Sequence, residues 1–262
     1  MKLYNSTENY FQGPDDMRNE VQMWFVAGGL LLQNLSEKAG SLPFGGLKEK
    51  IGYNERIKMK TVELLDLCSG PGNFVNHLSW IVPELSAICV DTNKKFVIDG
   101  NKAFEKFKFI EGDAVAVSLN KKFLFITASS AYHHIADKQK INFLKNIYKH
   151  LFDEGIVIIC ENFLPGYKNS QSREKAIKKY YSELELWYHE GNATREAIEI
   201  IGEVRNQELS QEVEHKVSFD IFKKHVAESG FLIDVDIAVW QPSSFILDNA
   251  GSHVIILKKR KI

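Results

Sequence analysis

The sequence has few cysteines, no excess of charge and no long apolar run, and each lack excludes a class of protein. Only three cysteines occur among 262 residues, and each lies in or beside an apolar run, which favours buried free thiols over a disulfide scaffold. The 33 basic and 34 acidic residues give a net charge of −1, so no overall field attracts nucleic acid or an anionic membrane. The apolar runs are too short to span a bilayer.

The sequence also lacks a secretory leader, the spacing of a tetrahedral metal site, internal repeats and low-complexity segments. These absences predict a cytoplasmic protein without a metal, whose partner is a small molecule rather than nucleic acid or membrane. A chain of 262 residues can bury one sizeable core, so we expect one domain with an elaboration.

The N-terminal part of the chain divides into two segments. Residues 8–13 resemble an engineered protease-cleavage sequence that lacks one leucine, so residues 1–14 are either a tag or a disordered tail. From Asp15, apolar residues recur at helical spacing as far as Gly40, which predicts a helix within an N-terminal segment over residues 15–59. Packing explains this stripe, and a role as part of a lid is compatible with it.

A strand, a tight turn and a helix are predicted over the stretch from Val62 to Val82. An apolar run ends in Asp66, a loop holds Gly70 and Gly72, and an amphipathic stretch follows. Glycines let the backbone approach a ligand, and the N-terminus of the helix presents unpaired N–H groups. The stretch has no third glycine and no following Lys-Ser/Thr, so it matches neither the dinucleotide fingerprint nor the P-loop.

Apolar runs alternating with helical patterns continue along the chain, including a helix expected from Asp137 to Gly155. This alternation predicts an α/β fold with a doubly wound, mostly parallel seven-stranded sheet, in which a final hairpin makes at least one strand antiparallel. Residues 164–217 show two helical periodicities and no strand, which predicts a helical insertion above the edge of the sheet.

Polar residues recur at the ends of five successive predicted strands. Each alone is explained as a helix cap. Because ligands bind at the carboxyl ends of strands in an open parallel sheet, their recurrence predicts a ligand site. These residues are Asp66, Asp91, Asp113, Ser129 and Glu161.

The run from Asp66 to Gly72 resembles motif I of class I S-adenosylmethionine (SAM) methyltransferases, which is usually acidic-x-Gly-x-Gly-x-Gly. Cys68 stands at the first glycine, which predicts an ordinary backbone geometry at that residue. The order of strands resembles the same family from about Lys60 onward. The resemblance implies a Rossmann-like SAM-binding domain over residues 60–262, with residues 164–217 as a helical lid.

The resemblance further implies the residues that bind SAM. Asp66 would order the loop or meet the ammonium group, Asp91 would accept hydrogen bonds from both ribose hydroxyls, and Asp113 would face the adenine. The cofactor-binding residues expected are Asp66, Cys68, Ser69, Gly70, Gly72, Asp91, Thr92, Asp113, Ala114, Ser129 and Ser130.

Candidates for catalysis and acceptor binding follow the fourth and fifth strands and lie on the insertion. His133, His134 and Glu161 are expected near the transferred methyl group, where a histidine can take a proton near neutral pH; alternatively, one histidine points into the sheet or caps the next helix. Without a further ligand, the three are not expected to hold a metal. Acceptor contacts are expected from Tyr132, His133, Tyr167, Tyr181 and Trp187, although core packing explains the aromatic residues of the insertion equally.

The sequence therefore predicts a SAM-dependent methyltransferase that transfers a methyl group in line to a small-molecule acceptor. A SAM-modifying enzyme of the carboxy-SAM synthase type is an alternative, with Arg195 or Arg205 facing the added carboxylate. A non-catalytic SAM-binding or protein-interaction module is another alternative, favoured if the insertion forms a homodimer interface. A nicotinamide-dependent oxidoreductase is less favoured because the third glycine is missing.

Overall fold

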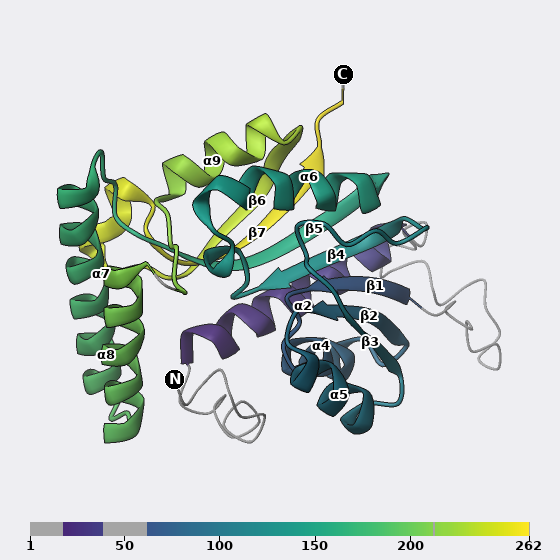
Figure 1. Cartoon of the computed structure of the whole chain (residues 1–262), viewed down its shortest axis with the longest axis horizontal. Helices are drawn as coiled ribbons and strands as arrows, with labels where there is room; N and C mark the ends of the chain where they lie inside the picture. The colour runs from purple at the N-terminus through teal and green to yellow at the C-terminus, as the bar shows by residue number, and fades with distance from the viewer. Residues whose placement is uncertain (1–17, 39–61, 212, 262) are drawn as a thin grey trace, which may run out of the picture.

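The structure is a computed structural model that describes residues 18–38, 62–211 and 213–261. The expected tag or tail over residues 1–14 lies outside the described residues. The expected helix start at Asp15 and helix end at Gly40 also lie outside them. Within these residues, the chain forms a central sheet covered by helices on both faces, with a helical hairpin standing at one end (Figure 1).

Seven strands form one mixed sheet in the order β3-β2-β1-β4-β5-β7-β6. Strand β7 runs antiparallel to both of its neighbours, β5 and β6, and the remaining pairs are parallel. The expected doubly wound, mostly parallel α/β sheet is thus confirmed. The strands are β1 Val62–Leu67, β2 Leu85–Asp91, β3 Phe107–Glu111, β4 Phe123–Ser129, β5 Leu151–Phe163, β6 Phe231–Trp240 and β7 Gly251–Lys259.

Each face of the sheet carries its own apolar core. Helices α2, α4 and α5 cover one face, and α6 and α9 cover the other (Figure 1). On α2, Met23, Ala27 and Leu31 are fully buried, whereas Phe25 and Leu32 of the expected apolar stripe are 60% and 46% exposed, so that stripe packs only in part. The helices are α2 Arg18–Lys38, α4 Asn73–Ile81, α5 Lys94–Ala103, α6 Lys140–His150, α7 Ser170–Glu190, α8 Arg195–Ser210 and α9 Phe219–Glu228, with short 3-10 turns η1 Tyr132–His134, η2 Asp137–Gln139 and η3 Ser243–Asp248.

Helices α7 and α8 form an antiparallel hairpin with a third apolar core, which includes Trp240 and Phe245 from the C-terminal part of the chain. The two ends of the inserted segment meet, because the N–H of Leu164 donates to the carbonyl of Val217 at 3.0 Å. Closely spaced ends let a segment be inserted without disturbing the sheet. The hairpin therefore follows the carboxyl end of β5 and packs around an apolar core of its own.

The expected helix from Asp137 to Gly155 is shorter than the sequence suggests, since α6 ends at His150 and Gly155 lies within β5. Leu151 is fully buried and pairs with Phe123 of β4, and the register shifts before Ile156. A Cβ at Gly155 would lie 2.7 Å from a Leu151 methyl group. The glycine is thus needed for an irregularity in the strand, and pairing with β4 overrides its helix-stopping tendency.

Among the described residues, no helix combines the length and the apolar character needed to cross a bilayer.

Two glycine substitutions test the packing around the turn before α4. Gly72 has φ of 101°, and a Cβ there would lie 2.5 Å from the Phe109 ring. We expect Gly72→Ala to lower the free energy of unfolding by about 1–3 kcal/mol through backbone strain and overpacking. Gly29→Ala in α2 is the control, because open space surrounds this position, and it should raise that free energy by up to about 1 kcal/mol. Urea unfolding measures both, and equal effects would contradict the packing described.

Candidate active site

A cavity of about 540 Å³ lies at the carboxyl ends of β1, β2 and β4, and this volume is typical of small-molecule sites. The loops that follow these strands form its walls, as the topology of an open parallel sheet predicts. The residues expected from the sequence that line it are Cys68, Ser69, Gly70, Asp91, Thr92, Asp113, Ala114, Ser129, Ser130, His133 and His134.

The loop after β1 adopts left-handed backbone conformations at Cys68, Gly70 and Gly72, with φ of 56°, 54° and 101°. The expectation of an ordinary backbone geometry at Cys68 is therefore wrong. The N–H of the next residue, Ser69, donates to the carbonyl of Val90 at 3.1 Å, so β2 holds the turn in place. Cys68 keeps the conformation of the glycine it replaces, at a cost of roughly 1–2 kcal/mol in backbone strain.

Asp91, at the end of β2, connects two walls of the cavity. Its Oδ2 accepts a hydrogen bond from the N–H of Gly70 and its Oδ1 accepts one from the N–H of Asn93, both at 2.8 Å. Burial raises the pKa of this carboxyl, and the two hydrogen bonds oppose that shift. Each carboxylate oxygen can accept further hydrogen bonds, so Asp91 can bind hydroxyl groups of a ligand in the cavity.

Asp66 and Gly72, both expected to bind the cofactor, are not among the residues that line the cavity. Asp66 is 1% exposed, and its Oδ1 accepts a hydrogen bond from the Thr127 hydroxyl at 2.5 Å. This contact joins the ends of β1 and β4 and is neither of the two roles expected for Asp66. Gly72 lies at the start of α4, where it serves the turn rather than the cavity wall.

Helix α2 contributes two cavity residues, Glu20 and Trp24, that the sequence analysis did not identify as functional. Trp24 Nε1 donates to Ser129 Oγ, and Ser130 Oγ donates to Glu20 Oε1, each at 3.0 Å. Burial raises the pKa of Glu20. The helical stripe identified Trp24 only as an apolar residue, and nothing in the sequence distinguishes Glu20 from a solvated helix residue.

His133 and Glu161 form a buried pair at the end of β5. His133 Nδ1 lies 2.6 Å from Glu161 Oε1, and the N–H of His133 donates to Oε2 at 3.1 Å. Burial alone would raise the pKa of Glu161, but the charge of His133 and its hydrogen bond outweigh burial and hold that pKa below its usual value. Glu161 is not among the residues that line the cavity; it fixes the orientation of His133.

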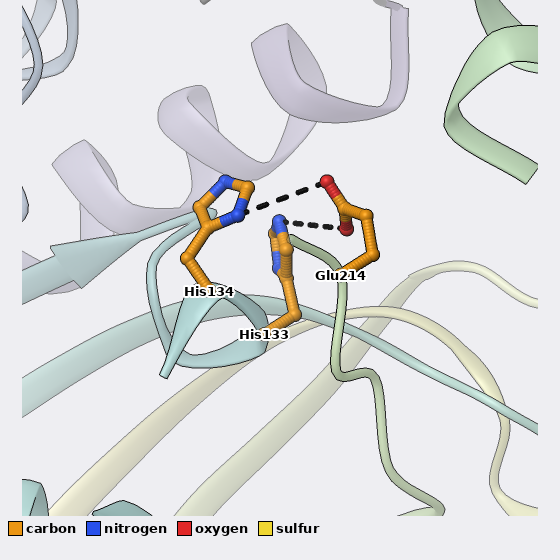
Figure 2. A group of neighbouring side chains, drawn as sticks. All are labelled: His133, His134 and Glu214. Carbon is orange, nitrogen blue, oxygen red and sulfur yellow. Dashed lines mark ion pairs between the residues drawn. The ribbon is translucent and has the colours of Figure 1, made fainter. Parts of the chain in front are cut away.

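Glu214, which the sequence analysis missed, faces both histidines (Figure 2). Its Oε2 lies 3.6 Å from His133 Nε2, and its Oε1 lies 3.7 Å from His134 Nδ1. The N–H of His215 donates to the carbonyl of His133 at 2.7 Å, which holds this segment against η1. Burial, followed by the charge of His133, lowers the pKa of His134 to about 4. No spacing in the sequence signals Glu214, because about 80 residues separate it from the histidines.

A second, smaller cavity of about 80 Å³ lies between η1, α2 and the α7–α8 hairpin. Glu20 and His133 line both cavities, so these two side chains mark the junction. The hydroxyl group of Tyr181 is buried in the wall and has no hydrogen-bond partner among the described residues. The other residues that line the small cavity are Asn19, Asn162, Tyr180, Leu184, Tyr188, Ile200, Ile201, Val204, Glu214 and Lys216.

Three of the expected acceptor contacts lie elsewhere. The Tyr132 hydroxyl is 2.6 Å from His225 Nδ1, and its ring packs against α6 and α9, because the η1 turn directs this side chain into the core. Tyr167 lies against Arg173, and Trp187 packs against Trp240. Of the residues expected to contact an acceptor, His133 and Tyr181 line the small cavity.

The cations proposed for a carboxy-SAM synthase also lie away from the site. Arg195 is exposed and pairs with Glu199 within α8, and Arg205 pairs with Glu185 of α7. Neither arginine is among the residues that line the two cavities. That alternative therefore lacks the cation that the sequence analysis assigned to it.

Residues 64–155 match the model of a family described as a methyltransferase domain. No curated protein matches the chain. Among solved structures, a SAM-dependent methyltransferase from Clostridium acetobutylicum ATCC 824 superposes with a TM-score of 0.52 at 14% identity, covering 77% of this chain and 85% of its own. A TehB-like SAM-dependent methyltransferase from Corynebacterium glutamicum ATCC 13032 Kitasato gives 0.50 at 12% identity, covering 77% and 82%.

The mitomycin 7-O-methyltransferase MmcR also shares the fold, with a TM-score of 0.53 at 9% identity over 76% of this chain and 49% of its own. This chain thus spans about half the length of MmcR. At these identities the superpositions show the fold alone. The strand order and the cavity define a Rossmann-like fold of the class I methyltransferase type. The family match assigns a methyltransferase domain to residues 64–155 within this fold.

The buried carboxyl of Asp66 makes stability depend on pH. Burial raises its pKa from 3.8 to about 7, so between these values the folded protein holds a proton that the unfolded chain releases. Stability should therefore fall as pH rises through 7. Asp66→Asn removes this titration. The free energy of unfolding of the variant minus that of wild type should therefore be larger at pH 8 than at pH 5, by up to about 3 kcal/mol.

Urea unfolding without SAM at the two pH values measures this change, with Asp99→Asn on α5 as the control. A difference between Asp66→Asn and wild type that stays constant with pH would contradict the raised pKa.

Proposed function

We propose that this methyltransferase transfers the methyl group of SAM directly, in line, to a small-molecule acceptor held in the small cavity. The observation that carries the proposal is the junction at Glu20 and His133, which line both cavities. A donor in the large cavity and an acceptor in the small one would meet there. Methyl transfer depends mainly on such positioning and on the exclusion of water.

The large cavity fits the cofactor. When bound, SAM supplies a methyl group that is already activated on its sulfonium. Asp91 would hold the ribose hydroxyls, and Asp113 and Ala114 would face the adenine. The left-handed turn at Cys68 and Gly70 brings the backbone to the cavity wall, where it would pass under the amino-acid portion.

His133 would take the proton of the acceptor. Its Nδ1 is occupied by the contact with Glu161, so its Nε2 can act as the base, and Glu161 would stabilise the imidazolium that forms. His134 lies beside it, with ring centroids 4.2 Å apart, and would exclude water from the junction. Glu161 therefore acts as a positioning residue.

The size of the small cavity and its enclosure by α2, α7 and α8 support a compact acceptor. Tyr181 offers a buried hydroxyl group in the wall of this cavity, with which a polar atom of the acceptor could form a hydrogen bond. We also propose that α2 and residues 164–217 form a lid over this site. The proposed location of the protein is the cytoplasm. The three described cysteines are free thiols, which fits a reducing compartment. A monomer and a homodimer both fit this arrangement.

Isothermal titration with SAM tests the cofactor site. Asp91→Ala should weaken SAM binding at least tenfold, because it removes a charged hydrogen-bond acceptor that is worth about 1.5–3 kcal/mol. Asp99→Ala, which removes a carboxylate of α5 that does not line the cavity, is the matched control and should bind like wild type. Unchanged SAM affinity in a folded Asp91→Ala variant would refute the assignment.

Turnover tests the role of His133. A panel of small amines, phenols and carboxylic acids is screened with SAM by following release of S-adenosylhomocysteine. With an accepted substrate, His133→Ala should lower kcat by about 10²–10⁴-fold with little change in SAM affinity. Glu161→Gln should lower kcat less and shift the pH profile, since it acts through His133.

His189→Ala on the exposed surface of α7 is the control for this series and should retain wild-type turnover. If His133→Ala also retains it, transfer proceeds without this base.

A further inference from the structure

His133, His134 and Glu214 direct their polar atoms toward one another at the junction of the two cavities (Figure 2). One donor atom from each lies within 4.8 Å of the others. Around a single tetrahedral ion with bond lengths of about 2.0–2.2 Å, donor atoms are about 3.3–3.6 Å apart. Glu214 faces each histidine with a different oxygen, Oε2 at 3.6 Å from His133 Nε2 and Oε1 at 3.7 Å from His134 Nδ1, and the donor atoms would draw closer together around an ion.

A second, independent observation concerns the far side of His133. Its Nδ1 is 2.6 Å from Glu161 Oε1, and the N–H of Asn162 donates to the same oxygen at 2.6 Å. A histidine that binds a metal almost always donates its other ring N–H to a carboxylate or carbonyl, which fixes the tautomer and the ring orientation. His133 has this arrangement, with Nε2 as the nitrogen that faces Glu214.

We propose that His133, His134 and Glu214 bind one divalent transition-metal ion, with Glu161 orienting His133. Two imidazoles and one carboxylate suit Zn²⁺, Fe²⁺ or Co²⁺, whereas Mg²⁺ and Ca²⁺ prefer sites made of oxygen ligands alone. The two histidines line the large cavity, and His133 and Glu214 line the small one. The remaining coordination positions would therefore face the space assigned to the reactants.

The surrounding charges are compatible with a cation. Lys216 Nζ donates to Glu214 Oε2 and lies 3.5 Å from Glu208 Oε2. Arg173 also pairs with Glu208. Two cations thus face these two carboxylates, and Glu161 adds a further negative charge beside His133. Glu214 Oε1 lies on the side of His134. His134 Nδ1 is also 3.3 Å from the carbonyl of Val213, so coordination through Nδ1 requires the Nε2–H tautomer and the loss of that contact.

This metal site does not rest on the proposed function. An ion on His133 Nε2 would occupy the lone pair that the proposed base uses, so the two roles exclude each other within one molecule. Metal binding is therefore measured without SAM or acceptor. Failure of metal binding leaves methyl transfer by His133 intact, and failure of the turnover experiments leaves the metal site intact.

The test is calorimetric titration of the EDTA-treated full chain with ZnCl₂. Wild type should bind one Zn²⁺ per chain with a dissociation constant in the micromolar range or tighter. Glu214→Gln should weaken binding at least tenfold, and Glu161→Gln should weaken it by about 10–100-fold, as loss of a carboxylate that orients a ligand does. The exposed α7 variants Glu190→Gln and His189→Ala are matched controls and should bind like wild type. Circular dichroism shows that each variant is folded.

A second measurement uses only the wild-type protein and is independent of variant folding. One equivalent of Zn²⁺ should protect His133 and His134 from modification by diethylpyrocarbonate, mapped by mass spectrometry, and should leave the exposed His189 reactive. The proposal is overturned by the absence of one-to-one binding to wild type, by wild-type affinity in folded Glu214→Gln, or by unchanged modification of both histidines.

Discussion

The buried carboxylate of Glu161 is the group on which the geometry of the site depends. It accepts hydrogen bonds from the backbone N–H groups of His133 and Asn162 and pairs with the His133 ring. A buried carboxylate is tolerated only when it is paired and fully hydrogen-bonded. One side chain at the end of β5 thus determines where η1 begins, which way His133 faces and which ring nitrogen is directed to the junction.

The same requirement extends into the insertion. Arg173 of α7 forms an ion pair with Glu208 of α8, and Glu208 also accepts a hydrogen bond from the N–H of Lys216 at 3.0 Å. These buried charges connect the hairpin to the segment that carries Glu214. Since removing one member would leave its partners buried and unpaired, the network selects one docking position for the hairpin, and the small cavity is a consequence of that position.

Function is thereby divided between two parts of the fold. The sheet and its loops form the large cavity, which we propose holds the cofactor, from backbone geometry and strand-end carboxylates such as the left-handed turn at Cys68 and the carboxylate of Asp91. The insertion and α2 contribute most of the walls of the smaller cavity. Variation in such inserted elements can change the acceptor while the cofactor site is retained, because the walls of the two cavities share few side chains.

The sheet, the motif loop and most of the cavity wall could be predicted from the sequence, because they depend on local periodicity and on the rule that strand ends converge. Asp91, Asp113 and Ser129 follow apolar runs and line the cavity. Asp66 fits the same pattern but lies behind the wall, since the pattern does not specify which way a side chain at a strand end points. The position of Gly155 within β5 could not be predicted either, because it depends on the pairing of this strand with β4.

Tertiary structure alone places Glu20 and Glu214 at the site and directs Tyr132 away from it. Glu20 reaches the site because α2 packs across the sheet, and Glu214 reaches it because the hairpin brings the end of the insertion back to η1. Tyr132 leaves the site because a 3-10 turn directs it into the core. The sequence by itself thus determined the class of fold and the edge of the sheet that carries the large cavity, which follow from local patterns. Long-range packing of buried charges, which leaves no periodic signal, decided the geometry of the small cavity.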